Sequence, residues 1–367
     1  MHGGRLAVFE ILEQFRLDGK AVSCKPYGNG HINRTYLVIT DRKHPYILQK
    51  INDIVFRDVP ALMHNISSVT HYLRARGLDA RHVLTLVSTF KGEEYLFHKS
   101  EETERCGYYR IYEFVTDSLC MDHPETTQDF RQSALAFGNF QMQLKDFPAA
   151  TLAQTIPKFH DTVERYRTLH RAIKADKMGR VSGATREIDF ALKQETHAGF
   201  MLDMLEKGDL PLRVTHNDTK LNNVMLDAIT REPLCVIDLD TVMPGLSGND
   251  FGDSIRFGAS SGAEDERDLD KIEMRLDLFR AYADGFLAAC GRTLTATEIE
   301  TLPMAAKLMT LECGVRFLTD YLEGDTYFRI HHPTHNLERT RTQFKLVADM
   351  ERKWDAMQTI IREEAAK

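Results

Sequence analysis

The most informative stretch of this 367-residue chain is Val214-Thr-His-Asn-Asp-Thr-Lys-Leu-Asn-Asn223, which Cys235-Val-Ile-Asp-Leu-Asp240 follows. Asp218 and Asn223 stand five positions apart, and Asp238 ends an apolar, strand-like run. A loop carboxylate can accept the proton of a hydroxyl group, while an amide oxygen and a second carboxylate can hold magnesium beside the phosphates of ATP. The spacing therefore predicts phosphoryl transfer, with Asp218 as the catalytic base and with Asn223 and Asp238 as metal ligands.

Each of these residues also has a purely structural interpretation. A side chain such as that of Asp218 or Asn223 can cap a helix or stabilise a turn, and His216 is expected to hold the loop by hydrogen bonds. The combination with Asp238 favours chemistry, because a carboxylate among apolar neighbours is costly unless a cation or hydrogen-bond donors compensate it.

Two other short motifs are interpreted as structural. Asp250-Phe-Gly252 matches the metal-binding tripeptide of protein kinases, but it follows a loop and not an apolar strand. We therefore expect Asp250 and Asp253 to cap the helix that follows or to brace the catalytic loop. His160-Asp161 resembles part of a metal site, and without further ligands at suitable spacing it is expected to begin a helix.

The composition restricts the class of protein. A net charge of −7 argues against a general nucleic-acid binder, and 43% hydrophobic with 28% charged residues is typical of a globular protein. The sequence has no apolar run long enough for a membrane span and no signal-peptide pattern at its start. The six cysteines are scattered, without Cys-x-x-Cys. We expect a cytoplasmic protein with no membrane association and no obligate protein partner.

The periodicity of apolar residues predicts an α+β chain with two lobes. The first third combines a leading helix, a helix over 59–76 and strands over 21–27, 34–40, 46–51, 83–90, 94–98 and 108–115. Helical patterns dominate afterwards, over 126–147, 159–208 with an interruption near 179–183, 264–285, 296–323 and 336–364. We expect an N-terminal nucleotide-binding lobe of residues 1–115 with an antiparallel sheet, and a larger, mostly helical C-terminal lobe of residues 116–367. The hinge is expected near 113–119.

One loop between predicted strands, Tyr27-Gly-Asn-Gly-His-Ile-Asn33, contains two glycines. Its backbone amides can approach an anionic group closely. Asn-Gly between strands is equally typical of a simple hairpin turn.

The residues quoted so far resemble a known family. His216-x-Asp218-x-x-x-x-Asn223 with Ile237-Asp238-x-Asp240 is similar to the aminoglycoside phosphotransferase/choline kinase-like small-molecule kinases, which share the protein-kinase fold. Within that family, the stretches 27–33, 46–49, 215–223, 250–258 and 312–317 resemble the N-acetylhexosamine 1-kinases, and the similarity covers essentially the whole chain.

The resemblance implies ATP- and Mg²⁺-dependent phosphorylation of the anomeric hydroxyl of N-acetylglucosamine or N-acetylgalactosamine, with Asp218 at the acceptor. It also implies further binding residues. Backbone groups around Glu113 and Val115 would contact adenine, and Gly28, Asn29 and Gly30 would cover the phosphates. His31, Arg316 and Tyr327 are candidates for sugar contact, although Arg316 can equally pair with a nearby acid and Tyr327 can equally serve packing.

One departure concerns the third strand, where protein kinases place a lysine that holds the α- and β-phosphates. Tyr46-Ile-Leu-Gln49 puts a glutamine at this position, and Lys50 beside it points to the opposite face. Gln49 is expected to offer hydrogen bonds to the nucleotide without a charge, which leaves the phosphate charge to magnesium and to the glycine loop.

Two rival functions remain open at this point. The first is a kinase of the same fold for another small alcohol, such as an amino alcohol, an aminoglycoside or another sugar. The second is a non-catalytic nucleotide-binding scaffold, which the joint presence of Asp218, Asn223 and Asp238 disfavours.

Overall fold

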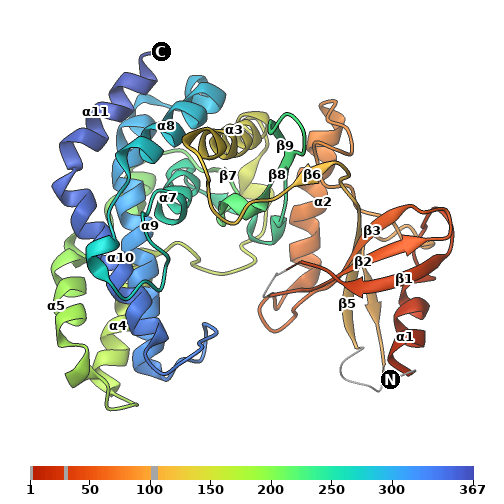
Figure 1. Cartoon of the computed structure of the whole chain (residues 1–367), viewed down its shortest axis with the longest axis horizontal. Helices are drawn as coiled ribbons and strands as arrows, with labels where there is room; N and C mark the ends of the chain where they lie inside the picture. The colour runs from red at the N-terminus through yellow and green to blue at the C-terminus, as the bar shows by residue number, and fades with distance from the viewer. Residues whose placement is uncertain (1–2, 29–31, 101–105) are drawn as a thin grey trace.

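The computed structural model describes residues 3–28, 32–100 and 106–367, and these form a sheet-containing N-terminal lobe and a helical C-terminal lobe (Figure 1). The N-terminal sheet is antiparallel, with its five strands in the order β1-β2-β3-β5-β4. Its strands are β1 (Ala21–Pro26), β2 (Arg34–Thr40), β3 (Pro45–Lys50), β4 (Leu96–His98) and β5 (Gly107–Glu113).

Two helices cover opposite faces of this sheet. Alternate residues of a strand point to opposite sides, and the strands carry apolar side chains on both. Helix α1 (Gly3–Leu12) lies on the face where Leu48 and Ile111 are buried. Helix α2 (Val59–Ala75) shares a core with Ile47 and Tyr112, the next residues along the same strands. Asp58 caps α2 by accepting a hydrogen bond from the Ala61 amide at 3.0 Å.

One predicted strand is wrong. Residues 83–90 and 94–98 were both expected to be strands, but of these only Leu96–His98 is one, and it pairs with β5. The segment 85–87 instead hydrogen-bonds farther along β5, through the amides of Val87 and Glu113. Both segments thus pair with different parts of the same edge of β5. The local sequence does not indicate which part of this edge each segment takes.

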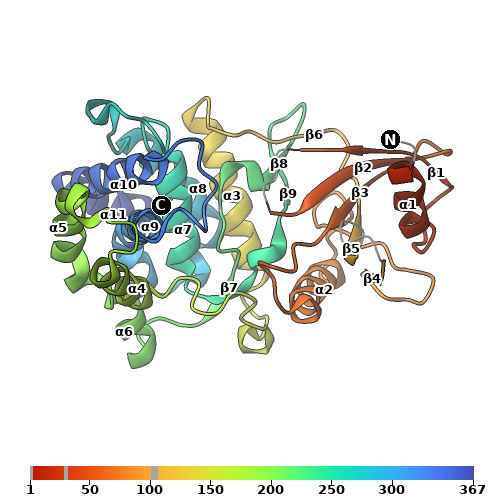
Figure 2. The same cartoon turned by 90° about the horizontal axis from the view of Figure 1, so that it is seen from below.

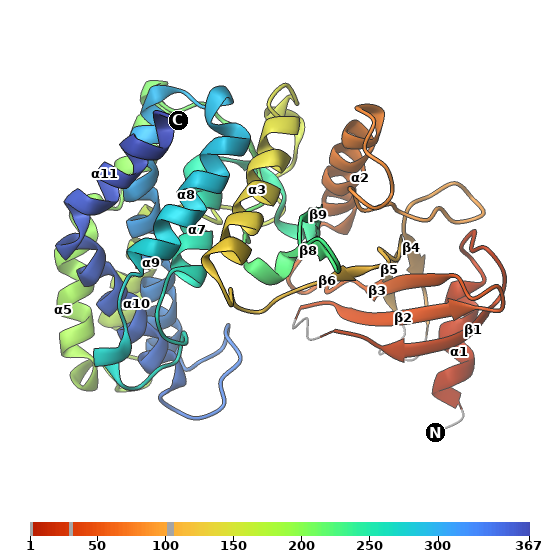
Figure 3. The ribbon, with the colours of Figure 1, turned by 45° about the horizontal axis from the view of Figure 1, so that its top comes forward.

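The C-terminal lobe surrounds the long, largely buried helix α9 (Ala296–Glu323). Figures 2 and 3 show α7 and α8 on the side of α9 that faces the smaller lobe, with α5 and α11 at the far side. The other helices are α3 (Thr127–Gln143), α4 (Thr162–Ala175), α5 (Thr185–Gln194), α6 (Phe200–Lys207), α7 (Ser247–Gly258), α8 (Leu276–Cys290), α10 (His335–Arg352) and α11 (Trp354–Ala365).

The short strands of this lobe include those that flank the motif residues: β6 (Ser118–Leu119), β7 (Arg213–Thr215), β8 (Val224–Asp227), β9 (Pro233–Val236) and β10 (Met243–Gly245). Two helical predictions are corrected. The segment 264–275 is mainly irregular, so that α8 begins at Leu276, and the predicted helix over 336–364 breaks at Lys353.

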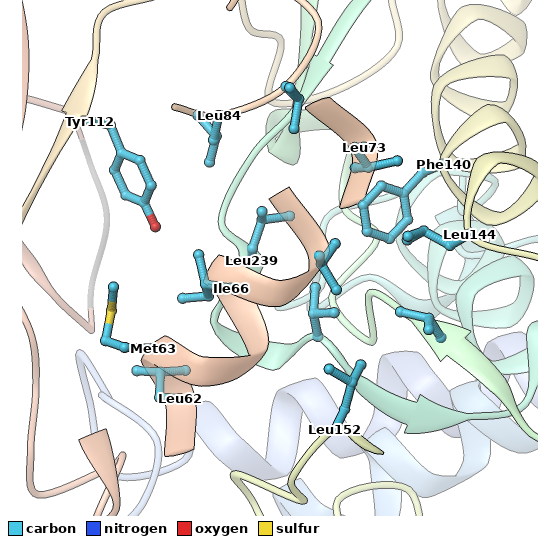
Figure 4. Packing of buried hydrophobic residues seen from close by; sticks show 14 of the residues in the cluster. Leu62, Met63, Ile66, Leu73, Leu84, Tyr112, Phe140, Leu144, Leu152 and Leu239 are labelled. Carbon is cyan, nitrogen blue, oxygen red and sulfur yellow. The ribbon is translucent and has the colours of Figure 1, made fainter. Parts of the chain in front are cut away.

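Helix α2 connects the two lobes through an apolar core. Leu62, Ile66 and Leu73 of α2 lie in one buried cluster with Phe140 of α3 and with Leu239 (Figure 4).

A polar contact secures the same helix. The buried side chain of Asn65 donates to the carbonyl groups of Val242 and Ala153, at 2.9 and 2.8 Å. The fold as a whole is the bilobed protein-kinase-like α+β fold that the sequence predicts. None of the helices in the described ranges is both long and apolar enough to cross a bilayer.

Candidate active site

The predicted base and the predicted amide ligand lie together in the loop after β7. Asp218 is partly exposed, with 28% of its side chain accessible. The side-chain nitrogen of Asn223 donates to the Asp218 carbonyl oxygen at 2.8 Å and to its carboxylate Oδ2 at 3.0 Å. Their separation of five positions closes a compact loop that ends in a short 3₁₀ turn, Leu221–Asn223.

A lysine in this loop escaped the sequence analysis. The Nζ atom of Lys220 lies 3.0 Å from Oδ2 of Asp218. Burial alone would lower the pKa of Lys220, but the charge of Asp218 outweighs it and raises this pKa. Lys220 is therefore a cation beside the candidate base, and its position two residues after Asp218 was the signal that could have found it.

His216 supports the loop, as expected. The ring is fully buried, with Nε2 2.8 Å from the Ile237 carbonyl oxygen and Nδ1 3.3 Å from the Asp218 amide. A carbonyl oxygen only accepts and an amide only donates, so Nε2 carries the proton and Nδ1 accepts. A neutral His216 thus ties the catalytic loop to the segment that leads into Asp238.

Asp250 braces the catalytic loop, which is one of its two predicted roles. The carboxylate accepts the backbone amides of His216 and Asn217 at 3.0 and 2.8 Å, and the side-chain amide of Gln141 at 2.8 Å. Burial raises the pKa of Asp250, and these donors oppose the rise. Asp253 acts similarly by accepting the Thr219 amide at 2.9 Å.

The position of this tripeptide corrects one detail. Asp250 was expected in a loop before a helix, but it already lies within the first turn of α7. Phe251 is fully buried in the helical core, and a Cβ atom on Gly252 would lie 2.5 Å from the Ala305 carbonyl oxygen. The tripeptide thus serves loop support and the close packing of α7 on α9.

Asp238 stands two residues beyond β9 in a left-handed backbone conformation, with φ of 59°. The residue as a whole is exposed to solvent, although protein atoms crowd its carboxylate. The pKa of Asp238 is raised to about 6, first because neighbouring protein atoms displace water and then because Asp240 and Asp218 are negatively charged. Such crowding of acids is relieved by a cation.

These residues fit a magnesium ion that is shared with a nucleotide. No group of three or more His, Cys, Asp or Glu side chains that could hold a metal exists within the described ranges. Mg²⁺ in kinases typically uses one or two protein groups together with substrate phosphates and water. Asn223 and Asp238 supply that number, and the raised pKa of Asp238 marks a position where positive charge is favourable.

Gln49, the predicted nucleotide contact on β3, is hydrogen-bonded to a buried arginine. It lies opposite Arg110 in the pairing of β3 with β5, and its Oε1 accepts from Nε and Nη2 of Arg110 at 2.9 and 2.8 Å. Sequence reasoning missed Arg110, because an arginine in an aromatic strand gives no local signal of a partner.

The predicted nucleotide contacts are placed in part. Gly28 is exposed with φ of 73°, a conformation that favours glycine, whereas Asn29, Gly30 and His31 lie outside the described residues. The Glu113 amide already donates to the Thr85 carbonyl oxygen, and its carboxylate contacts His44 at 2.8 Å. Within the described chain the amide of buried Val115 has no such acceptor, so Val115 is the better placed of the two for a nucleobase.

Arg316 and Tyr327, both predicted at the acceptor, lie side by side. Arg316 Nη2 is 3.4 Å from the Tyr327 hydroxyl oxygen. The guanidinium group lies 5.3–5.6 Å from the ring centres of Phe159, Tyr327 and Phe328. Burial would lower the pKa of Arg316, but Tyr327, Cys313 and Glu312 raise it, so Glu312, one helical turn away, compensates part of its charge without a direct ion pair in the described chain.

His160 links this cluster to the catalytic loop. Its Nε2 lies 3.3 Å from the Asn217 carbonyl oxygen and its Nδ1 lies 3.0 Å from Glu312, one helical turn before Arg316. Burial alone would raise the pKa of Glu312, but His160 and nearby arginines lower it. Asp161 caps α4 through the Glu164 amide, as the helix-start interpretation predicts.

The fold and this loop define a phosphotransferase with a protein-kinase-like architecture. The chain belongs to the phosphotransferase enzyme family, whose sequence profile matches residues 23–291.

Solved structures with the same fold include three small-molecule kinases. A microcompartment-associated aminopropanol kinase is 17% identical, with 96% of this chain and 98% of that chain covered and a TM-score of 0.61. An amicoumacin kinase in complex with AMP-PNP, Ca²⁺ and Ami is 13% identical, with coverage of 94% and 96% and a TM-score of 0.62. A choline kinase from Cryptosporidium parvum Iowa II is 15% identical, with coverage of 94% and 93% and a TM-score of 0.55.

Proposed function

We propose that the protein transfers the γ-phosphoryl group of ATP to the anomeric (C1) hydroxyl of an N-acetylhexosamine, either N-acetylglucosamine or N-acetylgalactosamine. The observation that carries the choice of acceptor is Arg316, which contacts Tyr327 and aromatic rings without an ion-pair partner in the described chain. A guanidinium group donates hydrogen bonds to carbonyl and hydroxyl oxygens but repels an ammonium group. A neutral acetamido sugar therefore suits this position better than an amino alcohol.

The one carboxylate in this cluster is already engaged. Glu312 is buried and accepts from His160 at 3.0 Å and from the Thr162 hydroxyl at 2.8 Å. Arg165 lies close enough to Arg316 for the two charges to lower the pKa of Arg165, after the larger effect of burial. The local charge is thus unfavourable for the cationic acceptors of amino-alcohol kinases. Tyr327 and His31 complete the proposed sugar contacts.

The catalytic loop supplies the chemistry of the acceptor. Asp218 accepts the proton of the anomeric hydroxyl as its oxygen attacks the γ-phosphorus in line. Asn223 orients the Asp218 carboxylate, and Lys220 places a positive charge beside it. Asn223 and Asp238 would hold Mg²⁺, which supplies neutralisation of the phosphate charge when bound.

The nucleotide is assigned to the N-terminal lobe, residues 1–115, and catalysis and acceptor binding to residues 116–367. Val115 offers a backbone amide to adenine, and Gly28, Asn29 and Gly30 cover the phosphates. Gln49 stays near the phosphates but its carbonyl oxygen is committed to Arg110.

The test is a substrate panel with product identification. Purified protein with ATP and Mg²⁺ is assayed against both N-acetylhexosamines, glucose, glucosamine, aminopropanol, choline and an aminoglycoside. We expect preferential turnover of an N-acetylhexosamine and a product whose phosphorus-31 spectrum shows a phosphate on C1. Preference for an amino alcohol would overturn the choice of acceptor and leave the kinase chemistry intact. If the protein binds alcohols without ATP and phosphorylates none of them, both the choice of acceptor and the proposed kinase chemistry are wrong.

A further inference from the structure

Arg110 on β5 is the largest side chain that the fold buries completely, with 1% of it exposed. It lies directly opposite Gln49 of β3, and two of its N–H groups share the Gln49 Oε1 atom. The amide nitrogen of Gln49 donates in turn to the Thr35 hydroxyl on β2 at 3.2 Å. Three neighbouring strands therefore hold one buried guanidinium group in a fixed place.

The charge of Arg110 is compensated from the other lobe. Its Nη1 atom lies 2.6 Å from Oδ1 of Asp240, and both side chains are almost completely buried. Asp240 follows the proposed metal ligand Asp238 by two residues. Its second oxygen accepts from Asn33 at 2.5 Å, at the end of the glycine-containing loop, and Asn33 accepts from the Asn52 amide at 3.0 Å.

In protein kinases, the ion pair that positions the nucleotide-binding residues is formed by a lysine on the third strand and a glutamate on the helix that packs against the sheet. Here that strand carries Gln49, and α2 presents Met63 (Figure 4), whose Sδ atom lies 3.9 Å from Nη1 of Arg110. The cation of this protein, Arg110, thus lies on the neighbouring strand β5, directly opposite Gln49. Its acidic partner, Asp240, lies in the segment that contains the proposed metal ligand Asp238.

We propose that Arg110 and Asp240 form a positioning pair that replaces this lysine–glutamate pair. The pair fixes the segment 238–241 and Asn33 against the sheet, so that Asp238 and the described end of the glycine loop are held toward the same nucleotide. Arg110 acts through Asp240 and Gln49, because its burial keeps it from direct contact with a ligand. The inference rests on the proposed nucleotide and metal roles and is independent of the acceptor.

The competing interpretation is a buried ion pair that contributes only to stability, and a set of variants separates the two. Arg110→Gln and Asp240→Asn each leave one buried charge without its partner, which is strongly destabilising. Arg110→Gln/Asp240→Asn removes both charges, and we expect it to fold because no charge stays buried without its partner. Gln49→Lys/Arg110→Gln returns the cation to β3. Arg213→Gln is the matched control, since Arg213 forms an ion pair with Glu298 at 2.5 Å inside the C-terminal lobe.

Two measurements are made on the whole chain: binding of Mg²⁺·AMP-PNP and of adenosine by calorimetry, and hydrogen exchange of residues 237–243 without ligand. We expect the neutral double variant to lose at least tenfold in affinity for Mg²⁺·AMP-PNP, to keep adenosine affinity within twofold, and to exchange faster over 237–243. Gln49→Lys/Arg110→Gln should regain part of the nucleotide affinity. Arg213→Gln should lower the melting temperature alone.

Unchanged Mg²⁺·AMP-PNP affinity and unchanged exchange in the neutral double variant would overturn the proposal. An equal loss of adenosine and nucleotide affinity would also overturn it, because it would indicate general disruption of the lobe. If the unaltered protein fails to bind Mg²⁺·AMP-PNP, the proposed kinase function itself is wrong, which distinguishes the two failures.

Discussion

The side-chain amide of Asn223 holds Asp218 through two hydrogen bonds, one to its carbonyl oxygen at 2.8 Å and one to its carboxylate at 3.0 Å. The amide nitrogen is fully used by these contacts, and the amide oxygen is the atom proposed to hold magnesium. The residue that orients the proposed base is thus also the residue that would position the metal, which would couple proton acceptance to phosphate binding.

Replacing the base with its isostere tests the catalytic role. Asp218→Asn keeps the size of the side chain but cannot accept the proton of the acceptor hydroxyl. We expect kcat to fall by about 10²–10⁴, the usual contribution of general acid–base catalysis, with little change in AMP-PNP affinity. Asp122→Asn is the control, because Asp122 accepts a hydrogen bond from Asn222 at the exposed side of the same loop and does not contact Asp218 in the described chain. A kcat near that of the unaltered protein would remove Asp218 from the mechanism.

Lys220→Met removes the cation beside Asp218 and keeps most of the aliphatic side chain. If Lys220 stabilises charge that develops during transfer, kcat falls by about 10²-fold while the KM for ATP changes little. Steady-state kinetics with both substrates varied measures the split. A rise in KM for ATP with kcat unchanged would indicate that Lys220 contributes to ground-state nucleotide binding instead.

Asp238→Ala and Asp250→Ala are expected to fail in different ways. The first should abolish the dependence of nucleotide binding on Mg²⁺ in a folded protein. The second leaves two buried backbone amides without an acceptor, at a cost of about 1–3 kcal/mol for each unsatisfied group, and should chiefly lower the melting temperature. Mg²⁺ titrations and thermal unfolding separate the two. Loss of Mg²⁺ affinity in a well-folded Asp250→Ala, with Asp238→Ala unaffected, would reverse the metal assignment.

The raised pKa of Asp238, about 6, predicts a pH dependence. A metal ligand must be deprotonated, so the affinity for Mg²⁺·AMP-PNP should fall as pH decreases through about 6. The effect on folding has the opposite sign. A pKa raised above its ordinary value stabilises the ligand-free protein at low pH, and this contribution disappears as pH rises through about 6. Calorimetry across this range, with Asp238→Asn as a variant that should lack the transition, checks the assignment.

Arg316→Ala tests the proposed sugar contact. We expect the KM for N-acetylhexosamine to rise about tenfold, the value of one hydrogen bond to a charged group, with the KM for ATP unchanged. Arg280→Ala on α8, which pairs with the exposed Glu363 and the buried Glu364 of α11, should change neither. Equal KM values for the sugar in Arg316→Ala and Arg280→Ala would exclude Arg316 from the acceptor site.

The elements that sequence periodicity predicted best are the long amphipathic ones. The helices at 59–75 and 296–323 end within a residue or so of the expected positions, because their caps and apolar faces are written locally. The order of the strands in the sheet was harder to predict from the sequence. Residues 85–87 and Leu96–His98 both lie along β5, and which segment takes which part of that edge depends on packing between distant parts of the chain.

The sequence by itself predicted the loop proposed to be catalytic, because Asp218, Asn223 and Asp238 lie within one short segment and an apolar, strand-like run precedes Asp238. Only the tertiary structure decided what supports it. Arg110 and Asp240 are 130 positions apart in the chain, and the distance between them, like that between Arg316 and Tyr327 across a helix end, is set by how the lobes and helices pack. A buried arginine needs an acidic partner that compensates its charge. Sequence spacing alone does not indicate which acid in the chain lies next to it.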